Sequence, residues 1–391
     1  MSREVGAAVT ASARAAAASE DRAGDVRVGE ELDSAAVDRW IKERMPELRG
    51  LPEVRQFSGG ASNWTYLLRY ADDAVGAGDR PGLEDGERAP HRTTDLVLRR
   101  PPAGTKAKSA HDMGRENRIQ AGLAPVYPYV PAMVGLCEDE SVIGAPFYVM
   151  RRIAGAIPRR TLPAGFDWTP ARTRALCENV VDRLVELHRV DVAAAGLAPL
   201  GKGPGYPRRQ IEGWSQRYEK ARTWNVPSFG RVRGWLAERC PVDAGHCLIH
   251  NDYRLDNVVL DPADPTRVVG ILDWEMATVG DPLMDLGAAL AYWVEAGDDW
   301  IARRMRRQPT HLPGMLHREE VVERYLDATG LHAADWPFYE VYGLFRVAVI
   351  AQQIYYRYYH RQTKNPAFRS FWIWVRYFHW RCRRVMARAA A

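Results

Sequence analysis

Hydrophobic and polar residues are arranged differently in the two parts of the chain. Before about residue 154, short apolar runs end at clusters of Gly, Pro and Asp, a pattern typical of strands. The strands predicted from these runs are Val54–Phe57, Trp64–Tyr70, Leu96–Arg100, Val130–Cys137 and Pro146–Arg152. Two helices are predicted among them, at 33–46 and at about 109–123.

Beyond residue 155 the apolar residues recur mainly with helical spacing. The predicted helices lie at 170–189, 208–223, 228–239, 318–328, 337–361 and 366–388. Together with the length of 391 residues, this change of pattern predicts two domains, one at 31–154 and one at 155–391. The first residues are rich in Ala, Ser and Arg, and we expect residues 1–30 to form a disordered tail.

A strand-like stretch interrupts the helical part and carries the candidate chemistry. Two apolar runs, Val258–Leu260 and Val268–Leu272, flank an Asp- and Pro-rich turn, which predicts a hairpin. Asp252, Asn257 and Asp273 stand near the ends of these runs. One carboxylate can orient an attacking hydroxyl, while an amide oxygen and a second carboxylate can hold Mg²⁺ against nucleotide phosphates. The spacing favours a phosphoryl-transfer centre over a polar turn with two solvated acids.

A helix start follows this stretch. Asp281 can cap the first turn, and Pro282 suits the first helical position. Asp285 comes one turn later among apolar residues, so its carboxylate needs hydrogen-bond donors, which the nearby loop backbone could supply. We therefore expect Asp285 to have a structural role.

Two features upstream could contact nucleotide phosphates. A loop of small residues between the first two predicted strands would let backbone N–H groups approach a phosphate; it contains Ser58, Gly59, Gly60, Ala61, Ser62 and Asn63. Alternation along the next strand places Arg99 on the same face as Val97, and Glu116 on the following helix could hold this cation. The simpler interpretations are an ordinary turn and a surface ion pair.

The charge is unevenly distributed along the chain. The formal net charge is +5, yet the segment from Tyr342 to Ala391 contains ten Lys or Arg residues and no Asp or Glu. We interpret this end as a partly buried helix with a basic outer face, and nucleic-acid binding is disfavoured because no recognisable module accompanies the charge. No apolar run is long enough for a membrane span. The five scattered cysteines favour a reducing cytoplasm.

In combination these motifs resemble the aminoglycoside phosphotransferase-like branch of the protein-kinase-like fold. The resemblance covers about residues 35–365 and is strongest to the group related to the kinase-like domain fused to acyl-CoA dehydrogenases in animals. The segments that carry it are QFSGGASNWTYLL, VLRRPP, SAHDMGREN, GAPFYVM, HNDYRLDN, LDWEMATVGDP and MDLG. It implies a bilobal α+β fold, with an N-terminal antiparallel-sheet lobe that includes a helix and a larger, mainly helical C-terminal lobe.

The resemblance also implies roles for the acidic motif. Asp252 would be the catalytic base, and Asn257 and Asp273 would bind Mg²⁺. The usual motif has Gly before the catalytic Asp, whereas Asn251 stands there in this chain. Because Asn tolerates unusual backbone angles better than most residues, the loop can keep its shape.

In the N-terminal part, the resemblance implies a nucleotide site. Arg99 would stand where kinases usually have a phosphate-binding lysine, with Glu116 as its ion-pair partner. The loop Ser58–Asn63 would cover the phosphates, and the connector from Met150 to Arg152 would form the hinge beside adenine.

The sequence thus predicts an ATP- and Mg²⁺-dependent kinase that phosphorylates a hydroxyl of a small molecule, with GTP and the oligomeric state left open. The basic C-terminal end favours an anionic or neutral acceptor such as a hydroxyacyl-CoA-like compound. An aminoglycoside acceptor would need an acidic site, for which Glu295, Asp298 and Asp299 are the candidates. A third hypothesis is a pseudokinase that binds nucleotide without catalysis.

Overall fold

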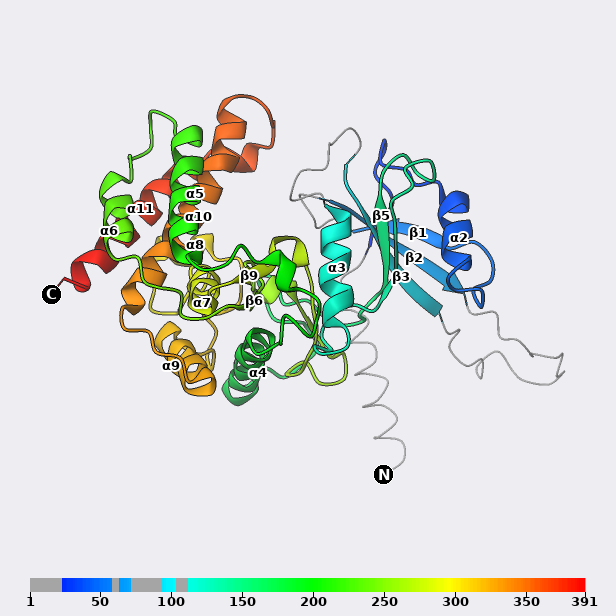
Figure 1. The fold of residues 1–391 in the computed structure, drawn as a ribbon, viewed down its shortest axis with the longest axis horizontal. Helices are drawn as coiled ribbons and strands as arrows, with labels where there is room; N and C mark the ends of the chain where they lie inside the picture. The colour runs from blue at the N-terminus through cyan, green and yellow to red at the C-terminus, as the bar shows by residue number, and fades with distance from the viewer. Residues whose placement is uncertain (1–22, 58–62, 72–92, 103–111, 391) are drawn as a thin grey trace. The chain divides into compact units, whose positions relative to one another are not determined.

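The computed structural model describes residues 23–57, 63–71, 93–102 and 112–390. These residues form two compact units (Figure 1). The N-terminal unit contains the described residues up to Gly155 together with the segment Val269–Glu275. The C-terminal unit contains Ala156–Val268 and the chain from Met276 onward.

The N-terminal unit is built on a five-stranded sheet in which every neighbouring pair is antiparallel. The strand order is β1-β2-β3-β5-β4, and the strands are β1 (Glu53–Gln56), β2 (Trp64–Ala71), β3 (Thr93–Arg100), β4 (Met133–Cys137) and β5 (Phe147–Arg151). Two helices accompany the sheet, α2 (Ser34–Lys42) and α3 (Met113–Leu123). The register places Arg99 on β3 opposite Tyr148 on β5.

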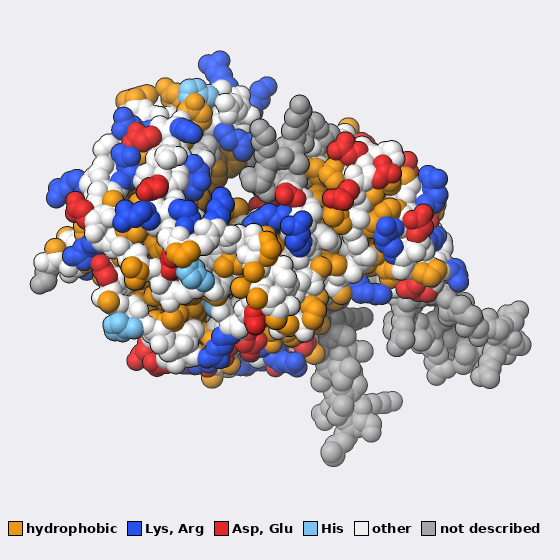
Figure 2. All heavy atoms as spheres, viewed as in Figure 1, with side chains coloured by type: hydrophobic (Ala, Val, Ile, Leu, Met, Phe, Trp, Pro, Cys, Tyr) orange, Lys and Arg blue, Asp and Glu red, His pale blue; other side chains and the backbone are white. Residues whose placement is uncertain are grey.

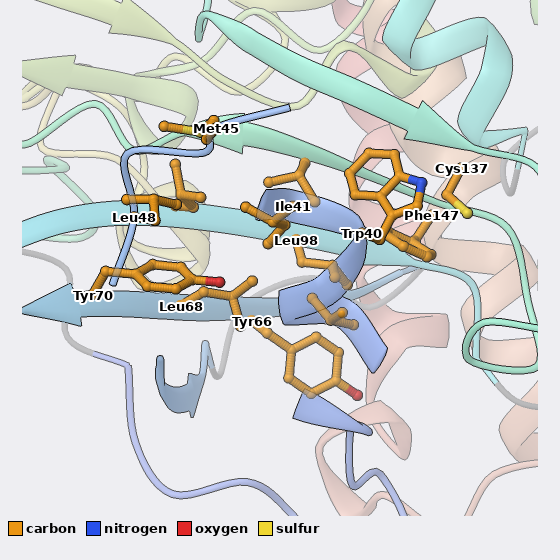
Figure 3. Close-up of a cluster of buried hydrophobic side chains, with 13 residues drawn as sticks. Trp40, Ile41, Met45, Leu48, Tyr66, Leu68, Tyr70, Leu98, Cys137 and Phe147 are labelled. Atoms are coloured by element: carbon orange, nitrogen blue, oxygen red, sulfur yellow. The ribbon is translucent and has the colours of Figure 1, made fainter. Parts of the chain in front are cut away.

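The alternation along β3 decides which side chains meet each helix. Leu98 belongs to a buried cluster with Trp40 and Ile41 of α2, in which Trp40 meets the ring of Phe147 edge-on at 5.0 Å (Figure 3). Val97, its neighbour, packs instead with Met113 of α3, on the other face of the sheet. Arg99 shares the face of Val97, so the sheet itself directs this cation toward α3.

Part of the predicted disordered tail is ordered in the structure. Residues 1–22 lie outside the described residues, but Gly24 pairs with Gln56 through two backbone hydrogen bonds of 2.8 and 2.9 Å. Tyr66 also donates its hydroxyl proton to the backbone oxygen of Glu30 at 2.6 Å. The prediction of disorder was therefore wrong for residues 23–30, because their backbone pairs with the edge strand β1, a contact that composition does not reveal.

The C-terminal unit is mainly helical. Its helices are α4 (Pro170–His188), α5 (Tyr206–Ala221), α6 (Gly230–Glu238), α7 (Pro282–Leu290), α8 (Trp300–Met305), α9 (Arg318–Thr329), α10 (Trp336–Tyr359) and α11 (Phe371–Arg388). Single 3₁₀ turns occur at Ala198–Leu200, Leu255–Asn257 and Pro366–Phe368. The short strands β6 (Cys247–Ile249) and β9 (Thr278–Gly280) pair antiparallel, and β7 (Val258–Leu260) follows the second of these turns.

The chain passes between the units along β8 (Val268–Ile271), and a further 3₁₀ turn spans Trp274–Met276. The predicted Asp- and Pro-rich turn before β8 is closed by a backbone hydrogen bond of 2.9 Å from Asp261 N to Arg267 O. The predicted start of α7 is also confirmed, because the Asp281 side chain accepts a hydrogen bond from Met284 N at 3.0 Å.

Two glycines let α7 and α10 approach closely. A side chain at Gly343 on α10 would collide with the backbone oxygen of Gly287 on α7, and one at Gly287 would collide with the backbone of Tyr339. The contact fixes α7, which carries Asp285, against α10, which carries Arg346. Both of these side chains bear on the candidate site.

The basic C-terminal end folds as predicted. In α11 the apolar side chains of Val375, Phe378 and Val385 are buried, while Arg383 and Arg384 are exposed. Figure 2 shows Lys and Arg side chains spread among hydrophobic ones over the helical part of this face. Among the described residues, no helix combines the length and the hydropathy that a membrane-spanning helix requires.

Candidate active site

The loop between β6 and β7 brings Asp252 and Asn257 together. The side-chain nitrogen of Asn257 donates to the backbone oxygen of Asp252 at 2.8 Å and lies 3.2 Å from its carboxylate Oδ2. Because the amide nitrogen faces Asp252, the amide oxygen of Asn257 points away from these contacts and can accept another partner. The Asp252 side chain keeps 20% of its surface exposed, so its carboxylate is accessible to a substrate.

The carboxylate of Asp285 holds the backbone of this loop through hydrogen bonds. Its two carboxylate oxygens accept the N–H groups of His250 at 2.8 Å and of Asn251 at 2.7 Å, and His188 Nε2 lies 3.1 Å away. Burial alone would raise the pKa of Asp285, but the hydrogen bond from His188 and the nearby His250 outweigh it, so this pKa lies below its ordinary value. The predicted structural role of Asp285, with the loop backbone as donor, is confirmed by these contacts.

Asn251 explains how the loop turns without the usual glycine. Its φ is +64°, in the left-handed region that Asn adopts more readily than most residues. Its side-chain oxygen accepts from the hydroxyl of Tyr206 at 3.1 Å, and its side-chain nitrogen donates to Met276 O at 3.1 Å. Arg346 of α10 donates to the backbone oxygen of Asn251 at 2.5 Å. The asparagine is thus held on both ends of its amide and at its backbone.

Arg254 is a contact of the candidate base that the sequence interpretation missed. Its Nε lies 3.2 Å from the carboxylate of Asp252 and its Nη2 lies 3.2 Å from that of Asp256, while the guanidinium sits 4.7 Å above the ring of Tyr292. The acid–arginine–acid alternation of residues 252, 254 and 256 was the available signal. Arg254 fixes the orientation of the Asp252 carboxylate from one side.

In the N-terminal unit, the predicted pair of Arg99 and Glu116 exists and is buried. Arg99 Nη1 donates to Glu116 Oε1 at 2.6 Å, and the two side chains are 9% and 3% exposed. This excludes the simpler interpretation of a surface ion pair. Burial raises the pKa of Glu116, and the Arg99 guanidinium opposes this shift.

Asp273 and Glu275 complete the surroundings of Arg99. Their carboxylates lie 3.4 and 3.6 Å from Arg99 Nη2. Asp273 has a φ of +66°, an uncommon conformation for a residue with a side chain, and its side chain is 36% exposed. Glu275, for which the sequence indicated no role, accepts from Asn63 Nδ2 at 3.3 Å.

The segment that carries Asp273 is anchored within the N-terminal unit, although the predicted boundary had placed it in the C-terminal domain. Ile271 N donates to Tyr129 O at 2.6 Å, and the buried ring of Trp274 meets Tyr127 edge-on at 6.1 Å. A linear boundary could not anticipate this, because the chain returns to the first unit more than a hundred residues after leaving it.

The remaining predicted nucleotide contacts are placed only in part. Ser58, Gly59, Gly60 and Ser62 lie outside the described residues. Met150 is buried on β5 between β3 and β4. Arg152 is engaged elsewhere, because its guanidinium contacts Asp95 at 2.9 Å. A hinge role for Met150–Arg152 would therefore rest on backbone groups, of which the N–H groups of Arg151 and Arg152 already donate to Ala132 O at 2.8 Å and to Asp95 O at 3.0 Å.

The side-chain oxygens of Asn257 and Asp273 are of the kind that Mg²⁺ prefers. Among the described residues, no three His, Cys, Asp or Glu side chains cluster as a metal site of their own. Mg²⁺ typically takes one or two protein oxygens and completes its shell with water and phosphate oxygens. The amide oxygen of Asn257 and the partly exposed carboxylate of Asp273 are, each by itself, hard oxygen donors of this kind.

Two curated relatives share most of this chain. Acyl-CoA dehydrogenase family member 10 of Mus musculus is 34% identical over 325 residues, which cover 82% of this chain and 28% of that protein. Acyl-CoA dehydrogenase family member 11 of Rattus norvegicus is 31% identical over 336 residues, which cover 84% of this chain and 40% of that protein. The chain therefore spans less than half the length of these relatives.

Solved structures give the fold. A crystal structure from Ralstonia eutropha JMP134, described as a candidate aminoglycoside phosphotransferase, matches with a TM-score of 0.73 at 28% identity and covers 92% of this chain and 99% of its own. A thermostable mutant of aminoglycoside phosphotransferase APH(4)-Ia, in ternary complex with AMP-PNP and hygromycin B, matches with a TM-score of 0.51 at 15% identity and covers 91% and 99%. The predicted bilobal α+β kinase-like fold is confirmed.

Comparison of the sequence with models of protein families identifies the family of this chain. The model of the phosphotransferase enzyme family matches residues 53–342, which is more than half of the chain and includes Arg99, Glu116 and the loop from His250 to Asn257. The chain belongs to the phosphotransferase enzyme family.

Proposed function

We propose that this phosphotransferase uses ATP and Mg²⁺ to phosphorylate a hydroxyl group of a small molecule. The observation that carries the proposal is the accessible carboxylate of Asp252, oriented by Asn257 and Arg254 on a loop whose backbone is fixed by Asp285. Such a carboxylate can only act reproducibly if its geometry is set before the substrate arrives.

In the proposed reaction, Asp252 accepts a hydrogen bond from the acceptor hydroxyl and aims its oxygen at the γ-phosphorus of ATP. The new O–P bond forms as the bond between the γ-phosphorus and the β,γ-bridging oxygen breaks, and ADP leaves with the bond electrons. The hydroxyl proton passes to Asp252 late in the transfer. Mg²⁺ bound by Asn257 and Asp273 would neutralise charge on the phosphate oxygens.

In the same proposal the N-terminal unit holds the nucleotide. Arg99 would grip the phosphates, and its guanidinium is already fixed by Glu116. The loop of Ser58–Asn63 would cover the phosphates, and the backbone of Met150–Arg152 would meet the adenine. The complex of APH(4)-Ia with AMP-PNP supports nucleotide binding by this fold.

For the acceptor we propose a hydroxyacyl-CoA-like compound. The names of the curated relatives support an acyl-CoA context. The acids that an aminoglycoside would need are already engaged. Asp298 contacts Arg318 at 2.7 Å, and Glu295 lies 3.3 Å from the same guanidinium. Asp299 caps α8 and accepts from Tyr377. An aminoglycoside remains the second candidate, favoured by the description of the Ralstonia eutropha structure.

Replacing the candidate base tests the reaction. Asp252→Asn should lower turnover by roughly a thousandfold, the scale of general-base catalysis, while binding of AMP-PNP with Mg²⁺ stays nearly unchanged. Asp327→Asn, on the exposed face of α9, is the matched control and should keep full turnover. Undiminished turnover of Asp252→Asn would exclude Asp252 as the base.

A substrate panel tests the acceptor. ATP consumption is measured with hydroxyacyl-CoA esters and, in parallel, with aminoglycosides. We expect Asp252-dependent phosphorylation of the esters. Phosphorylation of aminoglycosides alone would replace the proposed acceptor by the second candidate, and ATP binding without turnover of either class would favour a pseudokinase.

A further inference from the structure

A second site, distinct from the loop of Asp252, lies in the C-terminal unit. A cavity of about 1060 Å³ opens between α8 with the segment that follows it and the start of α11. This volume suits a ligand of nucleotide size. Its basic side chains are Arg160, Arg303, Arg304, Arg306 and His311. Two tryptophans, Trp300 and Trp374, also line it, and no Asp or Glu does.

The positive charge of the cavity is not compensated by the protein. Among the described residues, none of the cavity's four arginines forms an ion pair with a carboxylate, whereas Arg318 of the same unit pairs with Asp298 at 2.7 Å. Arg306 Nε and His311 Nδ1 are buried atoms for which the described residues offer no hydrogen-bond partner. Burial, together with Arg306 and Arg303, lowers the pKa of His311. Grouped cations that repel one another are stabilised when an anion binds.

The cavity wall is held in place by specific contacts. The Asp299 side chain accepts from Ile301 N at 3.0 Å and from Ala302 N at 3.1 Å, which caps α8, and Tyr377 on α11 donates to the same carboxylate at 2.7 Å. Arg307 lies 5.7 Å above the ring of Trp374. Two of the four arginines, Arg303 and Arg304, therefore lie on a short helix whose capping residue Asp299 is hydrogen-bonded to α11.

The same segment is bonded to the catalytic loop. Gln308 is 1% exposed, and its side-chain oxygen accepts from Leu255 N at 2.7 Å. Its side-chain nitrogen donates to Tyr292 O at 3.4 Å, and the ring of Tyr292 carries the guanidinium of Arg254. Hydrogen bonds of Gln308 thus join the segment after α8, which lines the cavity, to the loop that carries Asp252.

We propose that this cavity binds the phosphate-bearing end of the acceptor substrate and leaves its hydroxyl-bearing end to reach Asp252. The inference rests on the proposed function and sharpens it. Guanidinium groups hold phosphates through paired, charge-assisted hydrogen bonds. Trp300, which is 68% exposed, offers a ring on which a nucleobase can stack. Coenzyme A combines a diphosphate, a third phosphate and adenine at the end of a long arm, whereas a polycationic aminoglycoside would be repelled.

The test measures binding without turnover. Coenzyme A is titrated calorimetrically into the full chain saturated with AMP-PNP and Mg²⁺, so that the nucleotide site is occupied. The variant Arg303→Ala with Arg304→Ala removes two exposed guanidinium groups of the cavity. The matched control, Arg383→Ala with Arg384→Ala, removes two adjacent exposed arginines of α11 outside it. Pantetheine, which lacks the phosphates, is the ligand control.

We expect the cavity variant to bind coenzyme A at least about tenfold more weakly, because two charge-assisted contacts are lost. The α11 variant should bind like the unaltered chain, and pantetheine should not bind. Arg303→Lys with Arg304→Lys keeps the charge and should retain more affinity than the alanine pair. Equal affinity of both alanine variants, or no binding of coenzyme A by the unaltered chain, would overturn the proposal.

The result is separable from the proposed reaction. Asp252→Asn should bind coenzyme A with unchanged affinity while losing turnover. If coenzyme A binding depends on Arg303 and Arg304 but Asp252→Asn keeps its turnover, the binding site stands and the assignment of the base fails. If Asp252→Asn is inactive but the two alanine pairs bind coenzyme A alike, the base stands and the cavity assignment fails.

Discussion

The two units hold their candidate active-site groups by opposite means. In the N-terminal unit the buried cation Arg99 is compensated by the side chains around it, Glu116, Asp273 and Glu275. In the C-terminal unit the carboxylate of Asp252 stays accessible, and buried side chains fix the backbone that carries it.

The difference follows from what each group is proposed to do. A side chain that grips a phosphate must be aimed, and carboxylates on several sides aim a guanidinium. A base that exchanges a proton with a substrate must stay open to it, so only its backbone can be fixed firmly. Variants of the supporting residues should therefore affect the two units in different ways.

The largest effect should come from removing Asp285. Asp285→Ala leaves the N–H groups of His250 and Asn251 and the ring of His188 without their acceptor in a fully buried site. Loss of one partner from a buried charged network costs about 3–5 kcal/mol, so the free energy of unfolding of the C-terminal unit should fall by that amount. Denaturant unfolding measures it, and turnover should fall with it.

Asp327→Ala, on the exposed face of α9, provides the comparison. It should change the free energy of unfolding by less than about 0.5 kcal/mol. Equal stability of the Asp285 and Asp327 variants would show that the loop backbone does not depend on Asp285. It would contradict the inference that buried side chains fix the backbone that carries Asp252.

The next largest effect is expected at Arg99. Arg99→Met keeps the length of the side chain but leaves Glu116 buried without its cation, which should cost about 3 kcal/mol of stability in the N-terminal unit. The KM for ATP should also rise, by roughly tenfold, because a charge-assisted phosphate contact is lost. Steady-state kinetics with varied ATP, beside denaturant unfolding, give both values.

Arg99→Lys separates the two consequences. A lysine keeps the charge near Glu116 but cannot reach several carboxylates at once, so its stability should lie between those of Arg99→Met and the unaltered chain. If Arg99→Met left both the free energy of unfolding and the KM for ATP unchanged, Arg99 would neither stabilise the buried Glu116 nor contact the phosphates of ATP.

Local patterns predicted a large part of this site. Strand alternation placed Arg99 toward Glu116, and the apolar surroundings of Asp285 required donors that the loop supplies. Both inferences needed only burial and the periodicity of one element. The same holds for most helices and strands, whose apolar periods are strong.

Contacts between distant segments were not predictable. Arg346 reaches Asn251 across 95 residues of sequence, and Gln308 reaches Leu255 across 53. The segment of Asp273 joins the first unit through Tyr129 and Tyr127. Each of these contacts depends on how distant segments of the chain pack in three dimensions, and neither composition nor period along the chain contains that information.

Strong acid should weaken the support of the loop by protonating Asp285. The pKa of Asp285 lies below its ordinary value of 3.8 in the folded chain, so the folded state favours the ionised form. The resulting stability is fully present above pH 3.8 and is lost as the pH falls through the lower folded pKa. The difference in free energy of unfolding between the unaltered chain and Asp285→Asn should therefore shrink in this range.

Unfolding curves of both proteins from pH 6 to pH 2 measure this difference, and groups common to both proteins cancel. A difference that stayed constant over the whole range would mean that the charge of Asp285 does not contribute to stability.

The smallest effect should come from restoring the usual glycine at position 251. Asn251→Gly relieves a φ of +64° but removes the hydrogen bonds with Tyr206 and Met276 and gives the unfolded chain more freedom. The free energy of unfolding should fall by about 1 kcal/mol, with turnover changed less than about threefold because the backbone bonds to Asp285 and Arg346 remain.

Asn251→Ala loses the same hydrogen bonds and must also keep an unfavourable φ, so it should be less stable than Asn251→Gly by roughly a further 1 kcal/mol. If the alanine variant were the more stable of the two, the loop would have left the left-handed conformation. The backbone around Asp252 would then be less firmly fixed than its contacts with Asp285 imply.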